Sequence, residues 1–115
     1  MKGNDIVILG AGESGIGAAM LGKKLGYSTL VSDAGTIKQE YRDILIREEI
    51  EFEEKKHSLP IIKRAGEVIK SPGIPENSQV VKICREWGIP VISEIEFAAR
   101  HSKAKLLCIT GSNGK

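Results

Sequence analysis

A glycine-rich loop, Gly-Ala-Gly-Glu-Ser-Gly at positions 10–15, restricts the fold of this chain more than any other feature. An apolar run, Ile-Val-Ile-Leu, precedes the loop, and apolar residues at helical spacing follow it as far as Gly26. In such a loop Gly10 permits a sharp turn, Gly12 lets the backbone approach a phosphate, and Gly15 allows close packing of the helix. A strand, a G-x-G-x-x-G loop and a helix in this order predict the start of a Rossmann-like fold.

The same loop predicts a ligand that carries phosphate groups. Free N–H groups and the dipole at the start of the helix favour an anion. Asp33 follows the next strand-like run, at the spacing of the acid that accepts hydrogen bonds from a ribose or a base. These features indicate a nucleotide-containing ligand, although they fit a dinucleotide as well as a nucleotide sugar. The candidate contacts are Gly10, Gly12, Glu13, Ser14, Gly15 and Asp33.

The rest of the chain alternates between strand-like and helix-like segments, which predicts a parallel sheet with helices on both faces. Strands are expected at 6–9, 29–31, 67–70, 90–92 and 105–110, and helices at 14–25, 37–49, 60–64, around 80–87 and at 94–100. The charged run at 51–56 is expected to be a solvated edge strand or loop, the fifth strand of the first unit.

Helical spacing also predicts which side chains face the core. In the fourth helix the apolar face comprises Val80, Val81, Cys84 and Trp87. In the fifth helix it comprises Ile95, Ala98 and Ala99.

A second candidate ligand loop is Ser71-Pro72-Gly73-Ile74-Pro75, directly after the strand-like run at 67–70. Pro72 fixes φ, and Gly73 is free to adopt positive φ, so the segment predicts a turn. Ligands of parallel sheets lie at the carboxyl ends of strands, so Ser71, Pro72 and Gly73 are also candidate ligand contacts. The residues alone favour neither role.

The chain closes with Gly111, Ser112, Asn113, Gly114 and Lys115, directly after an apolar strand-like run. This order is typical of the start of a phosphate-binding loop, in which backbone amides wrap the phosphates of ATP and the lysine neutralises them. We therefore expect these five residues to be ATP contacts of a longer enzyme, with Lys115 stabilising the transferred phosphoryl group. A flexible Gly/Ser-rich tail is the alternative.

Composition excludes several other classes. Seventeen basic and fifteen acidic residues give a net charge of +2, too even for a nucleic-acid-binding surface. No apolar stretch approaches the roughly 20 residues that span a bilayer, so no membrane association is expected. Cys84 and Cys108 lie in apolar stretches without metal or redox spacing, which fits a cytoplasmic protein. His57 and His101 have no partner at catalytic or metal spacing, so solvent exposure is expected for both.

Together these motifs resemble the Mur ligase family, and the loop at 71–74 with Glu94-Ile95-Glu96 resembles its D-glutamate-adding members. The resemblance covers the whole chain. It implies that residues 1–93 form a Rossmann-like domain holding the UDP part of UDP-N-acetylmuramoyl-L-alanine, and that 94–115 begin a truncated P-loop ATPase domain. By the same resemblance Glu13 and Ser14 face the diphosphate, and Asp33 and Gly73 meet the uridine.

The parent reaction that the resemblance implies is ATP-dependent amide formation through an acyl phosphate, with D-glutamate as the attacking amine. ATP and Mg²⁺ would be its cofactors, whereas the 115-residue chain itself is expected to need none, to bind the UDP-sugar and to be inactive. The alternative from another class is a regulatory or redox Rossmann module that binds NAD or NADH. It explains residues 10–15 and Asp33 equally well, but leaves 111–115 unexplained.

Overall fold

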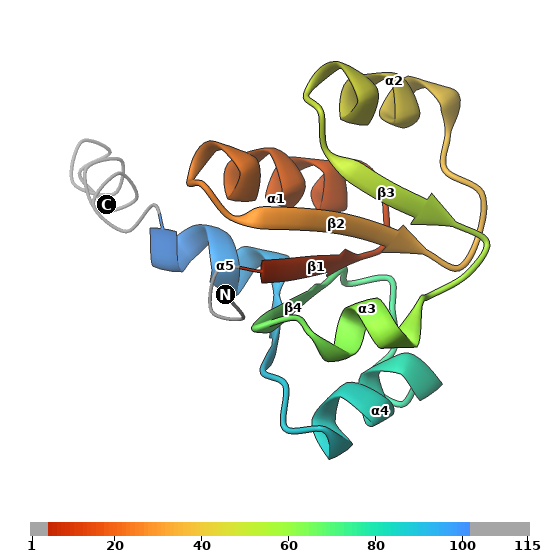
Figure 1. Cartoon of the computed structure of the whole chain (residues 1–115), viewed down its shortest axis with the longest axis vertical. Helices are drawn as coiled ribbons and strands as arrows, with labels where there is room; N and C mark the ends of the chain where they lie inside the picture. Colours follow the sequence, from red (N-terminus) through yellow and green to blue (C-terminus); the bar gives the residue numbers. More distant parts are fainter. Residues whose placement is uncertain (1–4, 102–115) are drawn as a thin grey trace, which may run out of the picture.

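A computed structural model describes residues 5–101, and these residues form a five-stranded, wholly parallel sheet in the order β3-β2-β1-β4-β5 (Figure 1). All the strands are short, and all except the charged β3 are apolar at their centres, as buried parallel strands are. The predicted α/β, Rossmann-like fold is confirmed. The strands are β1 Asp5–Leu9, β2 Ser28–Asp33, β3 Glu51–Glu54, β4 Glu67–Lys70 and β5 Val91–Ser93.

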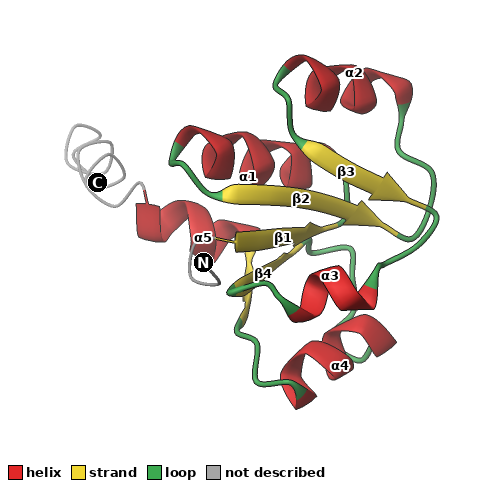
Figure 2. Ribbon diagram, in the orientation of Figure 1, coloured by secondary structure: helices red, strands yellow, loops and turns green. Residues whose placement is uncertain are grey.

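Helices cover both faces of this sheet (Figure 2). The helices are α1 Glu13–Lys24, α2 Gln39–Arg47, α3 Leu59–Lys63, α4 Gln79–Glu86 and α5 Glu94–His101. None of these described helices is long and apolar enough to cross a membrane. The predicted helices and strands within 5–101 are all present, with ends that differ by one or two residues.

Two apolar cores result, one on each face of the sheet. The first lies under α1, α2 and α5 and contains Ile6, Ile8, Ile16, Ala19, Val31, Leu45, Ile69 and Phe97. The second lies under α3 and α4 and contains Val7, Leu9, Ile62, Val68, Val80, Val81, Cys84 and Ile89. Alternate residues of β1 enter opposite cores, because successive side chains of a strand point to opposite faces.

Helix α5 packs on the sheet with a different face from the one that the sequence predicts. Phe97 is fully buried and Glu94 is only 6% exposed, whereas Ile95 is 76% exposed and Ala98 is exposed. The prediction for Ile95 and Ala98 was wrong because Phe97 packs beside Tyr27 and so sets the rotation of the helix. The proposed domain boundary at residue 93 stays a prediction.

Two further side chains depart from their predicted environments. Trp87 directly follows α4 with 37% of its surface exposed, and Lys63 lies over its ring, so Trp87 is not part of the core-facing row. His101 is half-buried rather than exposed, since its ring packs on Phe97 and its Nε2 lies 3.1 Å from the hydroxyl of Tyr27.

Cys84 is buried, as predicted. The strand expected at 105–110, with Cys108, lies outside the described residues.

The charged run forms the edge strand β3, which pairs only with β2 among the described strands. Its acids are more than a solvated surface. Glu54 accepts a hydrogen bond from the backbone N–H of Ile37 at 2.8 Å, and Glu53 binds side chains under the sheet. The solvated environment that the sequence predicts therefore applies to Glu51, which is exposed, and not to Glu53 and Glu54.

Candidate functional site

A cavity of about 630 Å³ lies at the carboxyl ends of the strands, bounded by the loops after β1, β2 and β4 and by α4. In Figure 1 this edge of the sheet is the side to which the strand arrows point. The volume is in the range of pockets that hold small organic ligands. The residues that line it are Gly10, Ala11, Gly12, Asp33, Ala34, His57, Leu59, Ser71, Gly73, Ile74, Ser78, Gln79, Val80 and Ile83.

The glycine loop has the geometry that its sequence predicts. Gly10 has φ +98°, a conformation that favours glycine, and it ends β1 in a sharp turn. A Cβ on Gly15 would lie 1.9 Å from the carbonyl oxygen of Gly10, so only glycine lets α1 start this close to the strand. A Cβ on Gly12 would meet no protein atom within 4 Å, which leaves open space between this backbone and the cavity.

Asp33 holds the glycine loop in place from the neighbouring strand. One carboxylate oxygen accepts a hydrogen bond from the backbone N–H of Ala11, and the other accepts one from Gly35, each at 2.7 Å. Asp33 therefore joins the loop after β1 to the loop after β2. Asp33 also lines the cavity, so the remaining lone pairs of its carboxylate can accept hydrogen bonds from a ligand.

The loop at 71–75 closes the cavity on the side of β4. The carbonyl oxygen of Ser71 accepts a hydrogen bond from Ile74, which gives the predicted turn, but Gly73 does not adopt the positive φ that it could tolerate. The side chain of Lys70 fixes this loop by donating to the carbonyl of Ile74 at 2.8 Å. The loops after β1 and β4 are in contact, since a Cβ on Gly10 would lie 2.9 Å from that of Ser71.

Of the predicted contacts, five line the cavity: Gly10, Gly12, Asp33, Ser71 and Gly73. Four others do not line it: Glu13, Ser14, Gly15 and Pro72. Glu13, Ser14 and Pro72 are exposed beside the cavity mouth, and Gly15 is buried against Gly10. The proposed ATP contacts at 111–115 lie outside the described residues.

A hydrogen-bond network under β2 reaches the cavity and was missed by the sequence analysis. The fully buried hydroxyl of Ser32 lies 2.6 Å from Nδ1 of His57 and 2.7 Å from a carboxylate oxygen of Glu53. Glu53 also accepts hydrogen bonds from the backbone N–H and the hydroxyl of Ser58. His57 is thus half-buried rather than solvent-exposed, because the chain after β3 turns back under the sheet.

The ionisation of this network follows from its contacts. Burial raises the pKa of Glu53, but the hydrogen bonds from Ser58 and Ser32 outweigh it and hold the pKa below its ordinary value. Burial lowers the pKa of His57, and the carboxylates of Glu53 and Asp33 only partly oppose it. At neutral pH Glu53 is therefore anionic, and His57, which lines the cavity, is neutral.

Part of the cavity wall is apolar. Its members come from α4, from the start of α3 and from the loop after β4, and only Ile74 belongs to a motif of the sequence. Their helical spacing could have indicated one face of α4, but not that this face extends past the core to the cavity. The apolar members are Leu59, Ile74, Val80 and Ile83.

A buried acid lies behind the glycine loop, outside the cavity. An oxygen of Glu94 would be 3.4 Å from a Cβ on Gly15, and neither carboxylate oxygen has a hydrogen-bond partner among the described residues. Burial raises the pKa of Glu94, while the nearby Ser14 hydroxyl and the charge of Lys70 act in the opposite direction. Glu94 thus lies where α5 meets the start of α1.

The fold and the cavity define a Rossmann-like domain with a candidate ligand site at the carboxyl edge of its sheet. Its architecture is shared with solved Mur-type ligases. A pseudomurein peptide ligase type C from Methanothermus fervidus matches with a TM-score of 0.72 and 26% identity, over 84% of this chain and 20% of that one. A UDP-N-acetylmuramate-alanine ligase from Thermotoga maritima matches in fold, with a TM-score of 0.71 and 20% identity over 87% of this chain and 23% of that one.

The MurD N-terminal domain family matches residues 5–80, and the chain belongs to that family. A UDP-N-acetylmuramoylalanine–D-glutamate ligase from Bacteroides thetaiotaomicron is 56% identical over 110 residues, which are 96% of this chain and 25% of the relative. The chain thus spans about a quarter of the length of the curated relatives it matches.

Proposed function

We propose that this chain is the UDP-sugar-binding part of a ligase that joins D-glutamate to UDP-N-acetylmuramoyl-L-alanine in peptidoglycan synthesis. The observation that carries the proposal is the cavity between the glycine loop and the loop at 71–75, in a domain of the MurD N-terminal family. The amides of Gly10 and Ala11 already donate to Ser32 and Asp33, so the amide of Gly12 and the first amides of α1 are the ones at hand for a diphosphate. The apolar wall suits a flat base.

We assign the parts of the ligand to the cavity as follows. The diphosphate lies against Gly10 and Gly12 at the mouth, where the exposed Ser14 can also reach it, and Glu13 points away from it. The uridine extends past Asp33 toward Gly73, with Ser71 and Pro72 beside it. Gly15 acts indirectly, because it lets α1 begin close to Gly10 and so directs the helix dipole at the phosphates.

The whole ligase would need parts that this chain does not supply. By the resemblance given above, ATP would provide the phosphoryl group that activates the ligand's carboxylate, with Mg²⁺ and residues 111–115 at its phosphates. Lys115 would stabilise the phosphoryl group during transfer. We assign residues 1–93 to UDP-sugar binding and 94–115 to the start of the ATP-binding domain, in a protein of the cytoplasm.

Thermal unfolding with different ligands tests the proposal. UDP-N-acetylmuramoyl-L-alanine and UDP should raise the melting temperature, and NAD should not. A ligand that binds only the folded state stabilises by about 2.7 kcal/mol at a hundredfold excess over Kd. A shift with NAD and none with either uridine nucleotide would show instead that the chain is a dinucleotide-binding module.

The variant Gly12→Val locates the ligand. Because a Cβ here meets no protein atom and φ is −80°, the variant should fold like the parent. Its larger side chain would fill the space between the backbone and the diphosphate, so the thermal shift with UDP should disappear. If the variant binds UDP as tightly as the parent, the ligand does not lie against this loop.

The purified 115-residue chain should show neither ATP hydrolysis nor amide formation, since it spans a quarter of its relatives' length. A coupled assay for ADP and chromatography of the UDP-sugar would measure both. Turnover of ATP by the chain alone would mean that the working unit is smaller than we propose.

A further inference from the structure

The side chain of His57 reaches the cavity from below β2. The glycine-loop motif does not predict this contact. His57 lines the cavity, and its Nδ1 lies 2.6 Å from the buried Ser32 hydroxyl. Among residues 5–101, Nε2 on the other side of the ring has no hydrogen-bond partner from the protein. The ring therefore has one nitrogen engaged by the protein and one available to a ligand.

The hydrogen-bond partners of Ser32 determine which nitrogen of His57 carries the proton. The Ser32 hydroxyl has a single proton, and two acceptors surround it, the carboxylate of Glu53 at 2.7 Å and the carbonyl of Lys56 at 3.2 Å. Since that proton goes to an acceptor, the short contact with His57 requires Nδ1–H to donate to Ser32. Neutral His57 then has a lone pair on Nε2, so the cavity-facing nitrogen is an acceptor.

Ser32, His57 and Glu53 are the residue types of a hydrolytic triad, but their positions exclude that role. Ser32 is fully buried, so no substrate can reach its oxygen, and the hydrogen bonds of Glu53 to Ser58 hold the carboxylate in place. The three residues act as a support that fixes the orientation of the imidazole. Leu59, two residues away along the chain, and Asp33, whose charge acts on His57, also line the cavity.

We propose that His57 contacts the bound nucleotide directly, its Nε2 accepting a hydrogen bond from a donor of the nucleoside. This inference rests on the proposed UDP-sugar site. A uridine offers two such donors, the imide N–H of the base and the hydroxyls of the ribose. His57 is then a specificity-determining residue, since a base that presents only an acceptor at this place would leave two lone pairs facing each other.

Two substitutions separate ligand contact from a purely structural role. The amide of His57→Asn can replace Nδ1 and keep the hydrogen bond to Ser32, but it has no acceptor at the position of Nε2. His57→Gln extends its amide to the position of Nε2 and gives up the contact with Ser32. We expect the Asn variant to bind UDP-N-acetylmuramoyl-L-alanine about 3- to 10-fold more weakly by titration calorimetry at pH 7.5, and the Gln variant within about 3-fold of the parent.

Analogues of the nucleotide identify the donor. Loss of the relevant donor, by 3-methyluridine diphosphate or by 2′,3′-dideoxyuridine diphosphate, should weaken binding to the parent but cause no further loss in His57→Asn. The analogue that retains this donor should still discriminate between parent and variant. If both analogues weaken binding to parent and variant equally, His57 contacts neither group and the inference is wrong.

The pH dependence of the parent's affinity gives a measurement that needs no variant. Protonation makes Nε2 a donor, and burial lowers the pKa of His57 against the charges of Glu53 and Asp33, with Lys56 also nearby. Affinity should be constant above pH 6.5 and decrease as the pH falls through the pKa of His57. The diphosphate diester of the ligand does not titrate there, and its carboxyl group titrates about three units lower.

The outcomes distinguish the inference from the function on which it rests. If the parent binds and Gly12→Val does not, but His57→Asn binds like the parent, only the inference fails. The reverse order of the two His57 variants, with Gln weaker than Asn, would mean that the contact with Ser32 alone matters and would also overturn it. No binding of any uridine nucleotide by the parent overturns both. If either variant does not fold, an affinity independent of pH between 5 and 8 overturns the inference.

Discussion

Single glycines in the first loop have separate tasks, which substitution by alanine can distinguish. Gly15→Ala should destabilise the chain by about 3 kcal/mol, because its Cβ would lie 1.9 Å from the carbonyl oxygen of Gly10 and the backbone must move. Gly17→Ala in the same helix is the control, as its Cβ meets nothing within 4 Å and alanine favours helix by about 1 kcal/mol. Urea unfolding of both variants would measure this difference. Equal stabilities would contradict the close contact of α1 with Gly10.

Asp33 has a structural task in addition to its proposed place beside the uridine. Asn in its place keeps one acceptor oxygen and directs an NH₂ group at a second backbone N–H, so one of the hydrogen bonds from Ala11 and Gly35 is lost. We expect Asp33→Asn to lower the free energy of unfolding by about 1 to 3 kcal/mol without any ligand present. Amide hydrogen exchange of Ala11 should become faster at the same time. Unchanged exchange would show that the carboxylate does not hold the loop.

At the scale of helices and strands, α5 provides a test of how the last described helix is attached. Phe97→Ala should cost about 3 to 5 kcal/mol, since the ring is fully buried beside Tyr27 and α1. Ile95→Ala, on the exposed face of the same helix, should change stability by no more than about 0.5 kcal/mol. Urea unfolding of the two variants gives the comparison. A small cost for Phe97→Ala would mean that α5 is only loosely held against the sheet.

Helix α5 also carries Glu94, whose burial disfavours the charged form of its carboxyl group. Because the pKa of Glu94 is raised above 4.5, its favourable contribution is complete below that pH and is lost as the pH rises through the higher value in the folded chain. Glu94→Gln stays neutral, so at pH 7 it should be more stable than the parent by about 1 kcal/mol. This advantage should vanish near pH 4. Glu96→Gln, exposed on α5, removes the same charge as a control and should show no such trend.

The positions of the helices and strands in the sequence were largely predictable, but the face that α5 turns toward the sheet was not. Hydrophobic runs and glycine stops located the helices and four of the described strands, because parallel strands buried on both faces are largely apolar. The charged run that forms β3 was predicted only as an edge strand or loop. In α5, however, helical spacing favoured Ile95 and Ala98 as inward residues. The contact of Phe97 with Tyr27 instead rotates the helix so that Phe97 is buried. Half of the cavity was missed for a similar reason. His57, Leu59 and the residues of α4 reach it from segments far apart in the sequence, with no motif of their own.

Over the whole molecule, stability should decrease on the acid side in two steps. His57 has a pKa below its ordinary 6.5 in the folded chain, so the unfolded chain takes up its proton first and stability begins to fall below pH 6.5. Glu53, whose pKa is also lowered, adds a second decrease below pH 4.5. Urea midpoints between pH 7.5 and 4 would show both steps. His57→Gln should remove the first step, and a parent whose midpoint does not change above pH 5 would contradict it.

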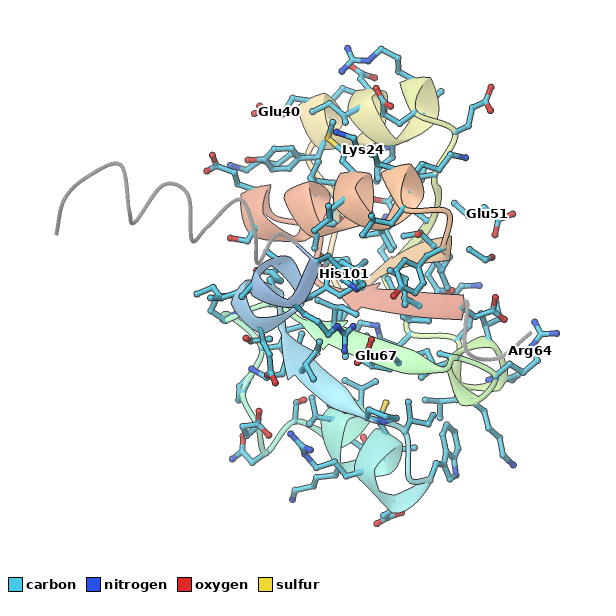
Figure 3. All side chains as sticks on the ribbon, turned by 90° about the vertical axis from the view of Figure 1, so that its left-hand side faces the viewer. Lys24, Glu40, Glu51, Arg64, Glu67 and His101 are labelled. Carbon is cyan, nitrogen blue, oxygen red and sulfur yellow. The ribbon has the colours of Figure 1, made fainter. Side chains whose placement is uncertain are left out.

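A salt bridge at the end of the sheet away from the cavity also fixes α5 to β4. Arg100 donates two hydrogen bonds to the carboxylate of Glu67, at 2.9 and 2.6 Å. Figure 3 shows Glu67 on β4 and His101 at the end of α5 on the same side of the molecule. The candidate site at the carboxyl ends of the strands and the contact of Arg100 with Glu67 at the start of β4 therefore lie at opposite ends of the strands.

The edge strand β3 has a consequence for how the protein behaves in a crowded solution. Its sequence, Glu-Phe-Glu-Glu, lies along the open margin of the sheet, where unpaired backbone groups could accept a strand from another molecule. Two copies that met there would bring their carboxylates face to face, and like charges on paired strands repel. The acids that support the cavity from below thus also discourage aggregation, and acidification, which neutralises them, removes that protection while it weakens the fold.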